Sequence, residues 1–123
     1  MTSADTAHGR LGELFAAIDA SDADGFVGFL TADAVFRFGS APAVSGSAAI
    51  REAVGGFFAT IAGCQHAIAR IIVEGDVVIC EGEVTYTRHD ASQLTLPFVN
   101  VFEMAGELIS IYRIYIDAGP LYD

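Results

Sequence analysis

The chain has 123 residues, of which 53% are hydrophobic, and a formal net charge of −10 with only six basic side chains. This length predicts a single domain spanning residues 1–123 with its own core. The scarcity of cations argues against binding to nucleic acid or to an anionic membrane surface. No stretch approaches the ~20 consecutive apolar residues of a membrane-spanning helix. Residues 1–10 lack a signal-peptide pattern, so we expect a cytoplasmic protein.

Helical spacing of apolar residues dominates the first half of the chain. Residues 7–20 carry one apolar stripe at positions i, i+3, i+4 and i+7, which predicts an amphipathic helix. Ser21 or Asp22 is expected to cap a second helix, which Asp33 ends, because short polar side chains can accept hydrogen bonds from the first turn. Ser47 is the expected N-cap of a third helix.

Strand signals begin between the second and third helices and dominate the second half. Residues 34–38 (AVFRF) predict a short strand, and the Gly, Pro and Ser residues of 39–47 predict a loop. Alternating apolar residues then predict four strands joined by short turns, near 64–74, 76–88, 93–104 and 107–117. Pro97 indicates a bulge or an edge. The expected class is α+β: three N-terminal helices packed on a strongly curved antiparallel sheet that forms a cone with an internal cavity.

Three stretches resemble the nuclear-transport-factor-2-like superfamily, in particular its SnoaL-like and ketosteroid-isomerase-like branch. They are FAAIDASDADGFVGFLTADAVFRF, SGSAAIRE, and GEVTYTRHDASQLTLPFVNVFEM continuing into YRIYID. The resemblance covers nearly the whole chain and implies a cystatin-like α+β roll. Members of this superfamily include isomerases, dehydratases, cyclases, epoxide hydrolases and binders without enzymatic activity, so the resemblance does not choose a reaction.

The catalytic residues of two well-known branches are largely missing. Where ketosteroid isomerases carry a tyrosine, a general-base aspartate and a second oxyanion donor, the resemblance aligns Leu14, Phe38 and Asn100. Only Asn100 keeps a hydrogen-bonding group. The polar positions of limonene epoxide hydrolases align with apolar residues or glycine: Phe36, Phe38, Gly82, Val84 and Ile114. Neither mechanism is therefore expected here.

The resemblance also assigns the two faces of the last strand. Tyr112, Ile114 and Ile116 have the parity of cavity-facing residues, whereas Arg113 and Asp117 belong to the convex face. Related proteins often dimerise through that face, so a homodimer is expected.

Three charged residues have expected structural roles. Arg113 is expected to pair with Glu83 or Glu103 at the dimer interface, and Asp117 to cap a turn. Arg88 either gates the cavity mouth or is an ordinary exposed arginine.

Applying the same parity to each strand predicts a cavity lined mostly by apolar side chains. The expected strand residues are Phe36, Phe38, His66, Ile68, Gly82, Val84, Tyr86, Leu96, Phe98, Asn100, Tyr112 and Ile114, with Phe15, Ile18 and Phe57 reaching in from the helices. Such a lining predicts a small, mainly apolar ligand oriented by a few polar groups.

His66 is the candidate general base, because the ordinary pKa of histidine lies near neutrality. Asn100, Tyr86 and Tyr112 are candidate hydrogen-bond donors to a developing oxyanion or enolate. The alternative for His66 is a core histidine bonded to the backbone. The sequence spacing suggests no metal site, no cofactor is expected, and the two cysteines are expected to be reduced thiols.

Two functions remain open from the sequence. One is a cofactor-free isomerase, dehydratase or cyclase acting on a cyclic or polyketide-like carbonyl compound. The other is a non-catalytic ligand-binding or dimerisation module that has lost the catalytic aspartates of its relatives.

Overall fold

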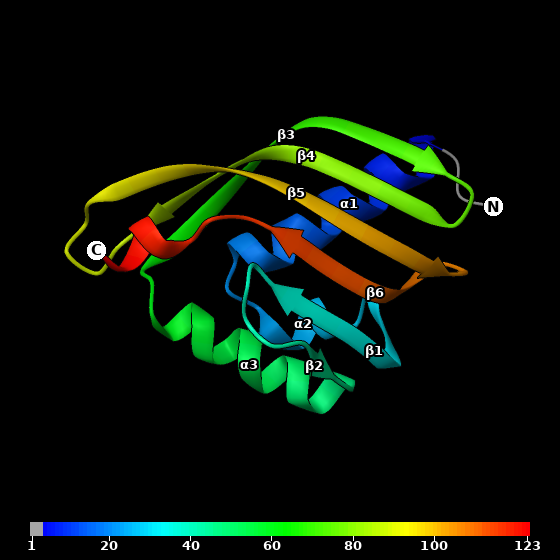
Figure 1. Cartoon of the computed structure of the whole chain (residues 1–123), viewed down its shortest axis with the longest axis horizontal. Helices are drawn as coiled ribbons and strands as arrows, with labels where there is room; N and C mark the ends of the chain where they lie inside the picture. The colour runs from blue at the N-terminus through cyan, green and yellow to red at the C-terminus, as the bar shows by residue number, and fades with distance from the viewer. Residues whose placement is uncertain (1–3) are drawn as a thin grey trace.

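A computed structural model describes residues 4–123, in which helices lie on one side of a curved sheet (Figure 1). Short turns and one loop connect the elements. In chain order they are α1 (Ala4–Asp19), α2 (Ala23–Val27), β1 (Leu30–Phe38), β2 (Val44–Ser45), α3 (Ser47–Ala59), β3 (Gly63–Glu74), β4 (Val77–Thr87), β5 (Gln93–Ala105), β6 (Leu108–Tyr115) and the 3₁₀ helix η1 (Gly119–Tyr122). The predicted α+β class is confirmed. No helix within this range is long and apolar enough to cross a membrane.

The strands form one six-stranded sheet in the order β2-β1-β6-β5-β4-β3. β3 to β6 make the predicted antiparallel meander. β1, however, runs parallel to β6, so the expectation of an entirely antiparallel sheet was wrong. The reason is topological: periodicity identifies strands but does not say which strand the end of the meander pairs with.

A bulge in β3 accounts for part of the sheet's curvature. The register of β3 against β4 shifts between Ile68 and Arg70, opposite Gly82. A β-carbon at Gly82 would lie 2.3 Å from the carbonyl oxygen of Ala67, so only glycine permits this approach of the two backbones. Bulges bend a strand and increase its twist. β3 therefore curves over the concave side of the sheet.

The helices cover the concave face in two places. α1 packs along β3, whereas α2 and α3 pack against each other and against β1 (Figure 1). Leu14 of α1, Ile50 of α3 and Phe102 of β5 are completely buried where these layers meet. Helices and sheet therefore share one core.

Several predicted boundaries shift in the structure. Asp22 does cap α2, accepting a hydrogen bond from the backbone of Gly25 at 2.9 Å. α2 is short, however, and β1 already begins at Leu30, so Asp33 lies inside a strand and does not end a helix. The N-cap of α3 is Gly46, which leaves Ser47 as the first helical residue. The predicted loop contains the two-residue strand β2, which pairs with β1.

Pro97 lies in β5 beside β4, at a point where β6 has already ended. The pairing of β5 with β6 begins only at Val99, so the strand has a neighbour on one side at the proline. This agrees with the expectation of a local edge.

The charged groups singled out in the sequence have structural partners within the chain. Arg113 pairs with Glu103 at 2.8 Å. Asp117 accepts a hydrogen bond from the backbone of Gly119 at 3.2 Å, as expected of a turn cap. Arg88 donates to the carbonyl oxygens of residues 120 and 121, so it anchors the C-terminal turn.

Candidate functional site

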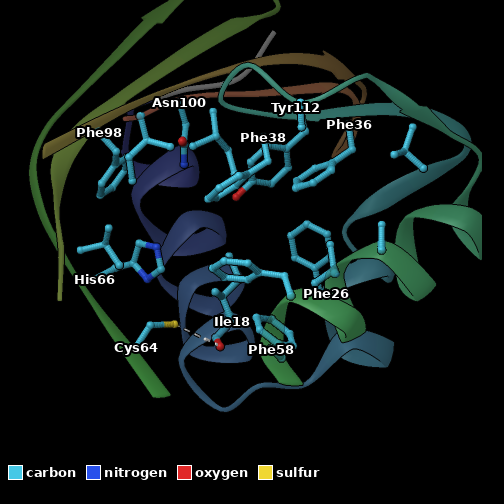
Figure 2. A pocket seen from close by; sticks show the side chains of 18 of the residues that line it. Ile18, Phe26, Phe36, Phe38, Phe58, Cys64, His66, Phe98, Asn100 and Tyr112 are labelled. Carbon is cyan, nitrogen blue, oxygen red and sulfur yellow. Dashed lines mark hydrogen bonds between the residues drawn. The ribbon is translucent and has the colours of Figure 1, made fainter. Parts of the chain in front are cut away.

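A cavity of about 210 Å³ lies between the concave face of the sheet and the helices. Figure 2 shows Asn100, Phe38, Tyr112 and Phe36 along one side, with Ile18, Phe58 and Phe26 opposite and His66 at one end. Most of its lining is apolar. The lining residues are Ile18, Phe26, Phe36, Phe38, Ala41, Pro42, Val44, Ala53, Val54, Phe57, Phe58, Cys64, His66, Val84, Tyr86, Phe98, Asn100, Tyr112, Ile114 and Ile116.

The structure brings most of the predicted lining together, with four exceptions. Phe15 is buried beneath the ring of His66 and does not line the cavity. Ile68, next to the bulge in β3, is 38% exposed, and Gly82 and Leu96 also lie outside the lining. The bulge changes the local register, so a strict period of 2 along β3 does not predict which of its side chains face inward.

The parity expected for the last strand agrees with the structure. Tyr112, Ile114 and Ile116 line the cavity. Arg113 reaches Glu103, and Tyr115 is 58% exposed. The conspicuous charges of this strand therefore play no part in the cavity chemistry.

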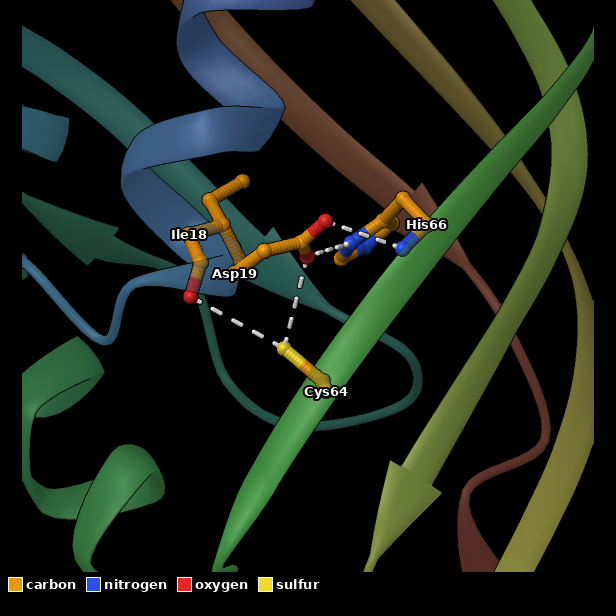
Figure 3. Close-up of polar contacts among 4 residues, drawn as sticks. All are labelled: Ile18, Asp19, Cys64 and His66. Atoms are coloured by element: carbon orange, nitrogen blue, oxygen red, sulfur yellow. Dashed lines mark hydrogen bonds and ion pairs between the residues drawn. The ribbon is translucent and has the colours of Figure 1, made fainter.

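The most distinctive polar group of the site is a pair formed by His66 and Asp19. Nδ1 of His66 lies 2.6 Å from Oδ1 of Asp19, and the backbone N–H of His66 donates to Oδ2 at 3.1 Å. Figure 3 shows the carboxylate at the end of α1 directed at β3 and bonded to both groups of the same residue. Because a carboxylate only accepts hydrogen bonds, Nδ1 must carry the proton.

Packing and burial determine the protonation state of the His66 imidazole. Its ring stacks on Phe15, with centroids 4.7 Å apart, and makes a T-shaped contact with Phe98, with centroids 5.4 Å apart. Burial lowers the pKa of His66 below its usual range, although the hydrogen bond and the charge of Asp19 act in the opposite direction. The ring is therefore neutral at pH 7, and Nε2 carries a lone pair. Among the described residues, Nε2 has no hydrogen-bond partner.

Cys64 lies beside this pair on the same face of β3. Its sulfur lies 3.7 Å from Oδ1 of Asp19 and 3.8 Å from the carbonyl oxygen of Ile18, so the single S–H can donate to either acceptor. Burial, with a further contribution from the charge of Asp19, raises the pKa of Cys64 to about 12. The free side chain is therefore a thiol at neutral pH and not a thiolate nucleophile.

Asn100 supplies an amide to the cavity wall. It is the single asparagine of the chain and only 2% exposed. Its Oδ1 is buried and has no hydrogen-bond partner among residues 4–123. Buried amides are rarely left unpaired, and an exception calls for an explanation such as a ligand. Oδ1 can only accept a hydrogen bond, so it would pair with a donor group of a ligand, whereas the amide N–H groups of Asn100 can donate to a carbonyl oxygen.

Tyr86 and Tyr112 line the cavity as predicted and are almost completely buried. Burial raises the pKa of both phenols, so both remain protonated. A protonated phenol can donate a hydrogen bond but cannot act as a base near neutrality. Tyr112 is also enclosed by aromatic rings, since Phe36 and Phe102 lie 5.2 and 4.6 Å from it, centroid to centroid.

Asp19 and Cys64 were not anticipated as site residues. Asp19 ends a helix and lies 47 positions from His66, so no local motif links the two. Only two sequence features point to these residues. Cys64 and His66 share the parity of one strand face, and Asp19 directly follows the apolar stripe of the first helix.

Comparisons with known proteins agree with this architecture. Residues 11–112 match the family model of the SnoaL-like domain. Among curated proteins, no sequence matches significantly.

Similar solved structures come from several organisms. A protein from Jannaschia sp. CCS1, proposed to be a SnoaL-like polyketide cyclase, is 17% identical over 94% of this chain and 88% of that chain, with a TM-score of 0.80. An epoxide hydrolase from M. tuberculosis, similar to limonene epoxide hydrolase, is 18% identical over 92% and 84%, with a TM-score of 0.76. A nuclear-transport-factor-2-like protein from Anabaena variabilis is 18% identical over 95% and 94%, with a TM-score of 0.82. At these identities, the likeness establishes the fold alone.

Proposed function

Since the chain belongs to the SnoaL-like family, we propose that it is a cofactor-free proton-transfer enzyme acting on a small cyclic carbonyl compound. His66 is the general base, Asp19 orients it, and Asn100 bonds to the carbonyl oxygen. The reaction type is isomerisation, dehydration or cyclisation through an enol or enolate.

The observation that carries this proposal is the hydrogen bond of 2.6 Å between Nδ1 of His66 and Asp19 in the wall of an apolar cavity. A carboxylate on one ring nitrogen fixes the tautomer and leaves the other nitrogen unprotonated. The second hydrogen bond to Asp19 and the contact with Phe15 also restrain the ring. A base held in this way needs little reorganisation before it accepts a proton.

The chemical step uses groups already present in the site. Nε2 of His66 takes a proton from the carbon next to the carbonyl, and the electron pair of that C–H bond becomes the enolate. Negative charge develops on the carbonyl oxygen, where the amide N–H of Asn100 donates a hydrogen bond. The imidazolium then returns its proton, either to another carbon or to a departing hydroxyl group. The first outcome is an isomerisation and the second a dehydration.

The size and polarity of the cavity limit the substrate. An apolar protein cavity of about 150 Å³ accommodates benzene, so about 210 Å³ suits a compound of one or two rings. The aromatic side chains Phe36, Phe38 and Phe57 favour a flat apolar body. The few polar groups lie at His66, Asn100 and the two tyrosines, which favours a substrate with one or two oxygens.

The absence of carboxylates at the expected positions supports a base located elsewhere. Phe38 aligns with the general base of ketosteroid isomerases, and Ile114 with a carboxylate of epoxide hydrolases. Both line the cavity as apolar side chains. The carboxylate that approaches the cavity here is Asp19, and it contacts His66.

The test measures exchange of the α-protons of 2-tetralone, a two-ring ketone, for deuterium in D₂O by proton NMR. The wild-type chain should accelerate this exchange. His66→Gln should reduce the rate by about 10²- to 10⁴-fold, the usual contribution of a general base. Asp19→Asn should reduce it by up to about 10⁴-fold, because its amide can donate to Nδ1 and so favour the wrong tautomer. His8→Gln, at an exposed position on α1, is the matched control.

A rate in His66→Gln equal to that of His8→Gln would contradict the assignment of the base. If 2-tetralone raises the melting temperature of the wild type without exchanging its protons, the result favours a binding module. That alternative keeps the cavity but gives His66 a packing role only.

A further inference from the structure

We propose that Asp19, Cys64 and His66 form a binding site for Zn²⁺ or a similar transition-metal ion. This ion inhibits the enzyme by binding Nδ1 of His66, the nitrogen through which Asp19 orients the base. Binding does not depend on the proposed function. The effect on turnover rests on it, because it requires His66 to be the base.

The three donor atoms already lie close together. The ligating atoms of Asp19, Cys64 and His66 are all within 4.8 Å of one another. A tetrahedral zinc ion with ordinary bond lengths separates sulfur from oxygen by about 3.6 Å, and nitrogen from oxygen by about 3.4 Å. The sulfur and Oδ1 of Asp19 are 3.7 Å apart. Nδ1 and Oδ1 are 2.6 Å apart, so they must move apart by about 0.8 Å to reach this geometry. Rotation of the Asp19 side chain at the end of α1 can supply this movement.

The donor set selects the class of metal. One sulfur, one imidazole nitrogen and one carboxylate oxygen suit Zn²⁺ and Co²⁺, whereas Mg²⁺ and Ca²⁺ prefer oxygen alone. A carboxylate and a thiolate together neutralise a divalent ion. The net charge of −10 also raises the local concentration of cations.

The outer oxygen of the carboxylate is already held in place. Oδ2 of Asp19 accepts the backbone N–H of His66, so Oδ1, which now contacts Nδ1 of His66 and the thiol of Cys64, is the oxygen that would ligate the metal. Hydrogen bonds of this kind orient metal ligands in known sites. Cys64 and His66 both line the cavity, so a fourth coordination position would open toward it.

Binding changes the protonation of two ligands. The thiol of Cys64 loses its proton to solvent when sulfur bonds to the metal. His66 stays neutral, but Nδ1 now donates its lone pair to the metal, and the ring proton moves to Nε2. Nε2 then has no lone pair with which to accept a substrate proton. One proton is released for each metal ion bound, and no oxidation or reduction takes place.

The probe is Co²⁺ added to the full chain after treatment with a chelator. One equivalent should produce visible ligand-field bands and a near-ultraviolet charge-transfer band from thiolate to Co²⁺, and Zn²⁺ should abolish both. Cys64→Ser should remove the charge-transfer band and weaken Zn²⁺ binding by roughly 100-fold. Cys80→Ala is the matched control: Cys80 is buried and lies outside the cavity lining, so the band should persist in this variant.

A charge-transfer band of equal strength in Cys64→Ser, or no stoichiometric binding of Co²⁺ by the wild type, would overturn the site. Melting curves with and without Zn²⁺ show whether Cys64→Ser is folded, and Asp19→Asn offers a second variant that keeps the thiol and should also weaken binding. In the 2-tetralone assay, Zn²⁺ should suppress exchange by the wild type and by Cys80→Ala. If Co²⁺ and Zn²⁺ bind as described while exchange continues unchanged, the site stands and the role of His66 as base is refuted.

Discussion

Replacing Asn100 by leucine should make the protein more stable and less active. The amide is 2% exposed, and its oxygen has no partner among the described residues. A buried unpaired polar group costs about 1–3 kcal/mol, and an apolar side chain of similar shape removes that cost. The larger leucine has room, because Asn100 borders the cavity of about 210 Å³.

The expected gain is about 1–2 kcal/mol. The entropy of unfolding for 123 residues is about 0.26 kcal/mol/K near the melting temperature. A gain of this size therefore raises the melting temperature by roughly 4–8 °C. Gln65→Leu also replaces an amide side chain by leucine, at an exposed position on β3, and should alter stability by less than about 0.5 kcal/mol.

Calorimetry measures the stability, and the 2-tetralone exchange assay measures the function. Loss of the donor to the enolate oxygen should lower exchange by about 10²- to 10³-fold. If Asn100→Leu melts at a lower temperature than Gln65→Leu, the amide of Asn100 already has a hydrogen-bond partner in the folded chain. Normal exchange by a folded Asn100→Leu would refute its role at the oxyanion.

Two further changes test the fold. Gly82→Ala places a methyl group 2.3 Å from the carbonyl oxygen of Ala67 and should lower the free energy of unfolding, measured with urea, by about 1–3 kcal/mol. In the control Gly63→Ala the methyl group meets nothing within 4 Å, so stability should change little. Equal stabilities of the two variants would contradict the close approach of the backbones at the bulge. Arg88→Gln removes the hydrogen bonds to the carbonyl oxygens of residues 120–121 and should speed carboxypeptidase digestion of the C-terminus, and an unchanged rate would show that Arg88 does not anchor this turn.

Periodicity identified the elements well because each depends on local spacing. The four strands of the meander begin and end within two residues of their predicted positions. The assignment of Tyr112 and Ile114 to the cavity came from the resemblance to the superfamily, and spacing then extended the same parity to the other strands. Prediction failed where neighbours decide the outcome: Ile68 lies beside a bulge, and the strand that begins at Leu30 forms by pairing with β6.

The sequence by itself determined the class of fold, the apolar character of the cavity, and the presence of His66 and Asn100 in its wall. Only the tertiary structure decided what His66 can do. Asp19 and His66 are 47 positions apart and become partners at 2.6 Å because α1 packs along β3. The same packing brings Cys64 to the carboxylate and creates a set of metal-binding donors. The chemistry of a histidine depends on the atom bonded to its other nitrogen, and here that atom is supplied by long-range packing.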